Sequence, residues 1–161
     1  MIKIVTGSIR SGKTTSLERW LRSAGADGVA GFLTPDGRDG RKVLRFIPTG
    51  ETLPFETPCD SPEQTVDIGP FCFLASTFEY ARTTLQRVAT TPVRLAVVDE
   101  LGKLELRGSG FEPALSRLIS AYRELPEHLL VLVIRDFLIG PARERYGLPQ
   151  EYLDLRDDPS G

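Results

Sequence analysis

The chain has 161 residues, of which 40 % are hydrophobic and 26 % charged, and its formal net charge is −2. This length predicts one domain over residues 1–161, and the near-neutral charge gives no reason to expect a nucleic-acid partner. No apolar run is long enough for a membrane span, and the sequence opens directly on a strand pattern. We therefore expect a cytoplasmic protein without a signal peptide or a membrane partner.

The first predicted strand is the apolar run Ile2–Val5, and the sequence Gly-Ser-Ile-Arg-Ser-Gly-Lys-Thr follows at positions 7–14. This run matches the phosphate-binding pattern G-x-x-x-x-G-K-[ST]. Hydrophobic residues at helical spacing then predict a helix from Lys13 to Ala24. Strand, glycine-containing loop and helix form the context that the motif requires, so the sequence predicts that a nucleoside triphosphate binds here.

The residue types of this loop suit the chemistry of a triphosphate. Gly7 and Gly12 let the backbone approach the phosphates, whose charge is surrounded by backbone N–H groups at the start of a helix. We expect Lys13 to contact the β- and γ-phosphates, the Thr14 hydroxyl to ligate Mg²⁺, and Thr15 to lie near the α-phosphate. The candidate nucleotide-binding residues are Gly7, Ser8, Ile9, Arg10, Ser11, Gly12, Lys13, Thr14 and Thr15.

Two short apolar runs come next, Val29–Thr34 and Val43–Ile47, with turn residues between them. They predict a β-hairpin near residues 29–47. Four basic side chains cluster in it: Arg38, Arg41, Lys42 and Arg45. They form either an exposed face or a source of one phosphate contact, such as an arginine finger.

The rest of the chain alternates strands with helices. The Pro-, Thr- and acid-rich stretch 48–70 predicts a long exposed connection with one short strand near 65–68. Beyond it we expect a helix over 74–88 that ends at 90–92, a strand at 94–100, a helix at 112–123, a strand at 129–134, a short helix near 141–146 and a last strand near 152–155. This order predicts an α/β fold with a mainly parallel sheet flanked by helices.

Acidic residues end the apolar strand at 94–100. In such a sheet, ligands bind beyond the carboxyl ends of the strands, so the residues after Thr6 and after Val98 reach the same edge. A buried aspartate requires a cation or hydrogen bonds. We therefore expect Asp99 to ligate Mg²⁺ with Thr14, and Glu100 to orient the attacking water. The alternative is that both acids merely begin a solvated turn.

Arg135 follows the strand that ends at Ile134, so we expect it at the same edge. Its guanidinium is a candidate for stabilising charge in the transition state. Together with Lys13 and Glu100 it forms the predicted catalytic set.

The run Asp-Glu-Leu-Gly-Lys-Leu-Glu-Leu at 99–106 resembles the D-E-[IL]-G-K-[ML]-E-L signature of the THEP-type nucleoside-triphosphatase family. These are small P-loop proteins with a RecA-like α/β fold. Gly-Phe-Leu-Thr at 31–34 resembles the G-F-x-T strand of that family, and Phe111 matches its phenylalanine. The resemblance implies Mg²⁺-dependent hydrolysis of nucleoside triphosphates, often with loose base preference.

Two segments depart from the family pattern. Ile9-Arg10 stand where a glycine often lies, and residues 40–46 lack the second glycine of the G-x-R-x-G-F segment. These departures leave the substrate preference open. The resemblance also draws attention to Lys103 and Glu105, which would otherwise be interpreted as parts of a solvated turn.

Three functions share these motifs. Hydrolysis of the γ-phosphate is favoured by Glu100 and by the run at 102–105. A small-molecule or nucleotide kinase would need an acceptor pocket and a lid, for which the segment 35–70 is a candidate. A nucleotide-gated accessory or binding module would use the triphosphate to order a loop for a partner.

Three residues bear on metals and redox chemistry. Cys59 and Cys72 are the only cysteines, and we expect reduced thiols rather than a disulfide framework. The single histidine, His128, excludes a histidine-rich metal site, and we expect it to be an exposed polar residue before a strand.

Overall fold

A computed structural model describes residues 1–7, 13–25 and 27–156, with Lys13 described by its backbone. The elements in chain order are β1 (Ile2–Gly7), α1 (Lys13–Ala24), β2 (Val29–Leu33), β3 (Val43–Ile47), β4 (Thr52–Pro54), β5 (Glu56–Thr57), β6 (Thr65–Ile68), β7 (Phe71–Leu74), α2 (Ala75–Thr90), β8 (Leu95–Leu101), α3 (Lys103–Leu106), α4 (Ala114–Arg123), β9 (Leu129–Arg135), the 3-10 helix η1 (Asp136–Leu138) and α5 (Ile139–Tyr146). The predicted mainly parallel α/β architecture is confirmed.

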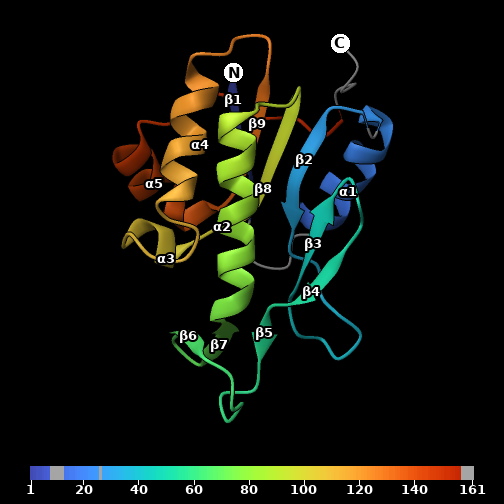
Figure 1. The fold of residues 1–161 in the computed structure, drawn as a ribbon. Coiled ribbons are helices and arrows are strands. Elements are labelled where there is room, and N and C mark those ends of the chain that lie inside the picture. The colour runs from blue at the N-terminus through green and yellow to red at the C-terminus, as the bar shows by residue number, and fades with distance from the viewer. Residues whose placement is uncertain (8–12, 26, 157–161) are drawn as a thin grey trace.

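The main sheet has six strands in the order β1-β9-β8-β2-β3-β4 (Figure 1). Its first four strands pair in parallel, and β3 and β4 continue it antiparallel. The hairpin predicted near 29–47 is therefore present as β2 and β3. Because β9 lies between them, β1, which leads into the phosphate-binding motif, and β8, which contains Asp99, are not neighbours.

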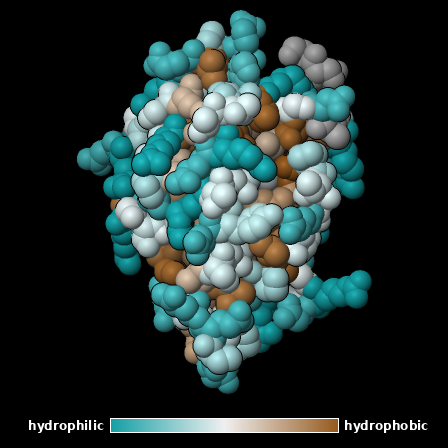
Figure 2. Space-filling model, in the orientation of Figure 1, coloured by the Kyte–Doolittle hydropathy of each residue, from teal (hydrophilic) through white to brown (hydrophobic). Residues whose placement is uncertain are grey.

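Helices cover both faces of the sheet, with α2 and α4 on one face and α1 on the other (Figure 1). Strand β9 shows why a nearly continuous apolar sequence is required. Its residues Leu130, Leu132 and Ile134 join the core under α2 and α4, whereas Val131 and Val133 join the core under α1. The outer face seen in Figure 2 is mostly hydrophilic, with small hydrophobic areas between polar side chains.

Gly31 in β2 explains part of the G-F-x-T resemblance. Its φ is +114°, and a Cβ at this position would lie 1.9 Å from the Val97 carbonyl oxygen of the neighbouring strand β8. No other residue type fits there without moving one of the two strands. The pairing that brings Thr34 beside Asp99 therefore depends on this glycine.

The segment predicted as a long connection at 48–70 contains more structure than expected. Besides β6, which matches the predicted short strand, it holds β4 and β5. Strands β5, β7 and β6 form a second, three-stranded antiparallel sheet at the N-terminal end of α2 (Figure 1). The sequence signal was weak because each strand is only two to four residues long.

Three further expectations are corrected. Cys59 and Cys72 form a disulfide with a Cα–Cα distance of 5.3 Å, because the second sheet brings them together, so the expectation of reduced thiols is wrong. His128 is half-buried against Tyr122 rather than exposed, with ring centroids 6.3 Å apart. In place of a last strand near 152–155, only Tyr152 forms an isolated bridge, to Ile4.

None of the described helices is long and apolar enough to cross a membrane.

Candidate active site

The carboxyl edge of the sheet carries the residues on both sides of the phosphate-binding motif. Strand β1 ends at Gly7 and α1 starts at Lys13, as the motif requires. Gly7 is the register partner of Arg135 at the end of β9. Of the predicted loop residues, five lie outside the described residues: Ser8, Ile9, Arg10, Ser11 and Gly12.

Asp99, near the end of β8, is almost fully buried, with 1 % of its surface exposed. Its Oδ2 accepts a hydrogen bond from the Thr14 hydroxyl at 3.1 Å and another from the Thr34 backbone N–H at 3.0 Å. Its Oδ1 is buried and accepts no hydrogen bond from any described residue. Burial raises the pKa of the Asp99 carboxyl, although the bond from Thr34 acts in the opposite direction.

The surroundings of Asp99 fit a hard divalent cation. A buried carboxylate oxygen without a partner carries a cost that a cation removes. The Thr14 hydroxyl lies beside it, at the start of the helix that follows the phosphate-binding loop. Mg²⁺ takes oxygen ligands and is commonly held by one or two carboxylates together with substrate phosphates. Among the described residues, no group of three or more His, Cys, Asp or Glu side chains that could hold a metal ion on their own is found.

Glu100, the next residue, has an unusual backbone conformation. Its φ is +67°, and no other described residue except glycine has a positive φ. The pairing of β8 with β9 shifts between Val98 and Leu101, so Glu100 lies in an irregular part of the strand. A left-handed conformation costs a non-glycine residue about 1–2 kcal/mol, and such outliers gather at functional sites.

The Glu100 side chain is 28 % exposed and forms an ion pair with Arg135, with Oε2 and Nη2 3.1 Å apart. The structure thus brings two of the three predicted catalytic side chains into contact. It also rejects the solvated-turn interpretation for Asp99, whose carboxylate is buried.

Lys103 and Glu105 lie in α3, the short helix after β8. The solvated-turn interpretation is wrong for Glu105, which is 3 % exposed. Its Oε2 accepts the Gly102 backbone N–H at 2.9 Å, and its Oε1 accepts the Phe111 N–H at 3.0 Å. The Lys103 ammonium lies 5.9 Å from the centre of the Phe137 ring. This cation–π contact joins α3, which follows β8, to η1, which follows β9.

The basic hairpin cluster is largely neutralised by acids. Arg41 pairs with Asp39 and Lys42 with Asp36. The remaining pair joins the hairpin to the helix after the phosphate-binding loop: Arg45 Nη1 and Glu18 Oε1 are 2.7 Å apart. Arg38 is exposed and has no ion pair with any described residue.

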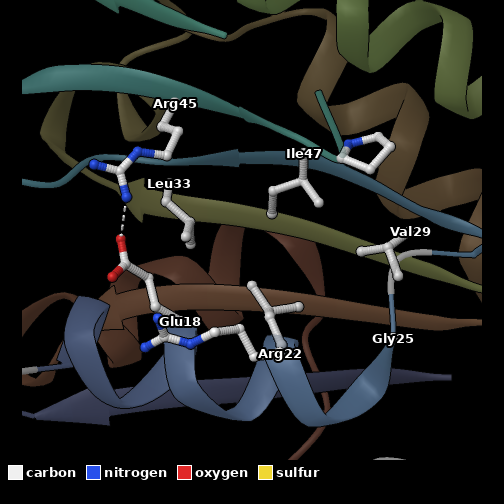
Figure 3. A pocket seen from close by; sticks show the side chains of 9 residues that line it. Glu18, Arg22, Gly25, Val29, Leu33, Arg45 and Ile47 are labelled. Atoms are coloured by element: carbon white, nitrogen blue, oxygen red, sulfur yellow. Dashed lines mark hydrogen bonds and ion pairs between the residues drawn. The ribbon is translucent and has the colours of Figure 1, made fainter. Parts of the chain in front are cut away.

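The Arg45–Glu18 pair closes one end of an open groove of about 380 Å³ between α1 and the β2–β3 hairpin (Figure 3). The groove is lined by Glu18, Leu21, Arg22, Gly25, Val29, Leu33, Arg45, Ile47 and Pro48. The three ion pairs with Asp39, Asp36 and Glu18 favour the interpretation of Arg41, Lys42 and Arg45 as part of an exposed hairpin face.

Comparison with known proteins decides the family. The sequence pattern of a family described as NTPase matches residues 3–136. The chain belongs to this family. It is also similar in structure to THEP1 from the hyperthermophile Aquifex aeolicus, with a TM-score of 0.71, 24 % identity, and coverage of 95 % of this chain and 88 % of that chain. A comparison with curated proteins finds no match. The predicted THEP-type resemblance and P-loop NTPase fold are thus confirmed, and at the level of the family the chain is a nucleoside triphosphatase.

Sequence reasoning missed two contacts of this edge. The backbone of Thr34 donates to Asp99, and the only signal for it was the G-F-L-T resemblance. The Tyr146 hydroxyl, from α5, lies 3.0 Å from the Glu105 carbonyl oxygen. No local pattern connects residues that are so distant in the chain.

Proposed function

We propose that this NTPase is a Mg²⁺-dependent phosphohydrolase that cleaves the γ-phosphate of nucleoside triphosphates, with broad base preference. The observation that supports this most is the buried Asp99 carboxylate, whose Oδ1 has no hydrogen-bond partner among the described residues while its Oδ2 accepts from Thr14. A divalent cation held together with the nucleotide phosphates would supply the missing partner.

The phosphate-binding loop and the start of α1 would hold the substrate. Backbone N–H groups of residues 7–15 and the Lys13 ammonium would surround the phosphates, with Thr15 near the α-phosphate. Thr14 and Asp99 would hold Mg²⁺, directly or through water. When bound, the cation neutralises charge on the β- and γ-phosphates.

Glu100 would orient the water that attacks the γ-phosphorus. Water adds oxygen to that phosphorus as the bond to the bridging oxygen breaks, which yields a nucleoside diphosphate and inorganic phosphate. Arg135 would stabilise the negative charge of the transition state. Two observations support a position of Arg135 between Glu100 and the phosphates. Arg135 forms an ion pair with Glu100, and its register partner on β1 is Gly7, the first residue of the phosphate-binding motif.

The direct test is phosphate release from ATP, GTP, CTP and UTP with Mg²⁺ and no acceptor molecule. Release with several bases supports the proposal, and omission of Mg²⁺ should abolish it. Release at background with every nucleotide overturns the proposal. Because no acceptor is present, the same assay separates hydrolysis from transfer by a kinase.

Replacement of Glu100 tests its assigned role. Glu100→Gln should lower kcat by about 100-fold or more, because an amide does not accept a proton from water. Triphosphate affinity should remain within about twofold, since the side chain is assigned to the water and not to the phosphates. Single-turnover phosphate release and equilibrium binding measure the two quantities. An equal loss of binding would make Glu100 a structural or metal-binding residue.

A further inference from the structure

The loop that follows the active-site acids is built around a buried side chain to which the proposed mechanism gives no role. We propose that Glu105 is a positioning residue for Glu100: its carboxylate fixes the loop backbone and so maintains the conformation that aims the Glu100 side chain. This inference rests on the proposed hydrolysis, in which Glu100 orients the water.

Glu105 joins two distant points of its own loop. Its Oε2 accepts the N–H of Gly102, before α3, and its Oε1 accepts the N–H of Phe111, after α3. Gly110 makes room for this carboxylate: its φ is +63°, and a Cβ there would lie 2.0 Å from Glu105 Oε1. The loop is therefore shaped around the carboxylate, rather than the carboxylate being accommodated by chance.

The hydrogen bond from the Gly102 N–H to Glu105 is important because Gly102 follows Glu100 by two residues. Glu100 has a left-handed backbone conformation, which persists only where the surrounding structure fixes it. The ladder between β8 and β9 is irregular between Val98 and Leu101 and resumes with the pair Leu101–Ile134. The chain directly after Glu100 is thus anchored first by the strand pairing of the buried Leu101 and second by the hydrogen bond of Gly102 to Glu105. Without the second anchor, the strained backbone has less to maintain it.

Helix α3 is also held from outside. The Tyr146 hydroxyl shares its hydrogen bond between the Glu105 carbonyl oxygen, at 3.0 Å, and Glu112 Oε1, at 2.6 Å. Glu112 is itself fixed by Ser116, whose hydroxyl donates to Oε1 at 2.9 Å. The backbone and the side chain of Glu105 are therefore both anchored, which keeps the carboxylate at a fixed distance from the end of β8.

The experiment compares Glu105→Gln with the wild type and with a core control. Glutamine has the same size, but its amide nitrogen accepts no hydrogen bond, so one of the two backbone N–H groups loses its partner. At a temperature well below the Tm of every variant, kcat should fall about 10- to 100-fold, while KM stays within about twofold. The control is Leu95→Ala, a buried residue at the start of β8 and in the core under α1, which should lower Tm at least as much and leave kcat unchanged.

A double variant separates positioning from general destabilisation. If Glu105 acts through Glu100, Glu100→Gln combined with Glu105→Gln should be no slower than Glu100→Gln alone. Should Glu105→Gln not fold, Tyr146→Phe removes only the hydroxyl that holds α3, and it should lower kcat two- to fivefold at unchanged KM.

The outcomes distinguish the two proposals. A wild type that releases no phosphate overturns the proposed function, and the inference with it. If the wild type is active, two results overturn the positioning role alone. One is a wild-type kcat for Glu105→Gln, and the other is a double variant whose fold-loss in kcat is the product of the two single fold-losses. Where Tyr146→Phe is the variant that folds, an unchanged kcat overturns the role in the same way.

Discussion

Asp99 at the end of β8 and Glu105 in α3 are both buried carboxylates, and burial raises the pKa of each. They differ in their partners. Both oxygens of Glu105 accept backbone N–H groups, whereas Oδ1 of Asp99 accepts no hydrogen bond from the part of the chain that the structure describes. Leaving a buried polar group unsatisfied costs about 1–3 kcal/mol, and more when it is charged. The hydrogen-bonding capacity of Glu105 is therefore used within the fold, whereas Asp99 keeps one oxygen that the proposed ligand would use.

The largest effect that tests this contrast is on activity. Asp99→Asn should lower phosphate release by about 100-fold or more, equivalent to about 3 kcal/mol, because the cation loses its charged ligand. Tm without nucleotide should stay the same or rise, since a buried, partly unsatisfied charge is removed. Thermal unfolding and phosphate release measure both. Asp67→Asn, an exposed change of the same kind in β6, is the control. A clear drop in Tm for Asp99→Asn would contradict the contrast.

An intermediate effect is expected on stability at Gly110. Gly110→Ala introduces a Cβ 2.0 Å from Glu105 Oε1 at a φ of +63°. The left-handed conformation and the displaced carboxylate should together lower the free energy of unfolding by about 2 kcal/mol or more. Urea denaturation measures it, with Gly40→Ala as the control, because that glycine also has a positive φ but nothing near its Cβ. Equal losses for the two variants would show that Glu105 does not require the space.

The smallest effect is on pH dependence. Because burial raises the pKa of Glu105, its folded state binds the proton more tightly than the unfolded chain. Its contribution to stability is therefore full below the unfolded pKa and is lost as pH rises through the folded pKa. The stability of the wild type relative to Glu105→Gln should accordingly fall from about pH 4.5 upward, by no more than about 1.4 kcal/mol per pH unit. Denaturation of both proteins across this range measures it, and a difference that grows with pH would contradict the shift.

The sequence predicts the parts of this molecule whose pattern repeats over many residues. The apolar runs of β1, β8 and β9 and the helical spacing of α1, α2 and α4 are long enough to be recognised. The strand-end rule predicts that Asp99, Glu100 and Arg135 share the edge that carries Thr14. The structure has Asp99 in contact with Thr14 and Glu100 in contact with Arg135.

Other features depend on partners that are distant in the chain. Helix α3 has four residues, too few for a helical pattern, and the burial of Glu105 depends on the Phe111 N–H and on Tyr146. The disulfide between Cys59 and Cys72 likewise follows from the second sheet, of whose short strands only β6 is predicted by the sequence. The local sequence around each residue does not predict such contacts.

The position of β9 has a geometric consequence for the substrate. Adjacent strands lie about 4.8 Å apart, so the ends of β1 and β8 are separated by about 10 Å, with β9 between them. A phosphate chain bound between Gly7 and Asp99, as proposed, would lie over the end of β9. Arg135 is the last residue of that strand. The order of strands thus places Arg135 midway between the two strand ends that would hold the substrate.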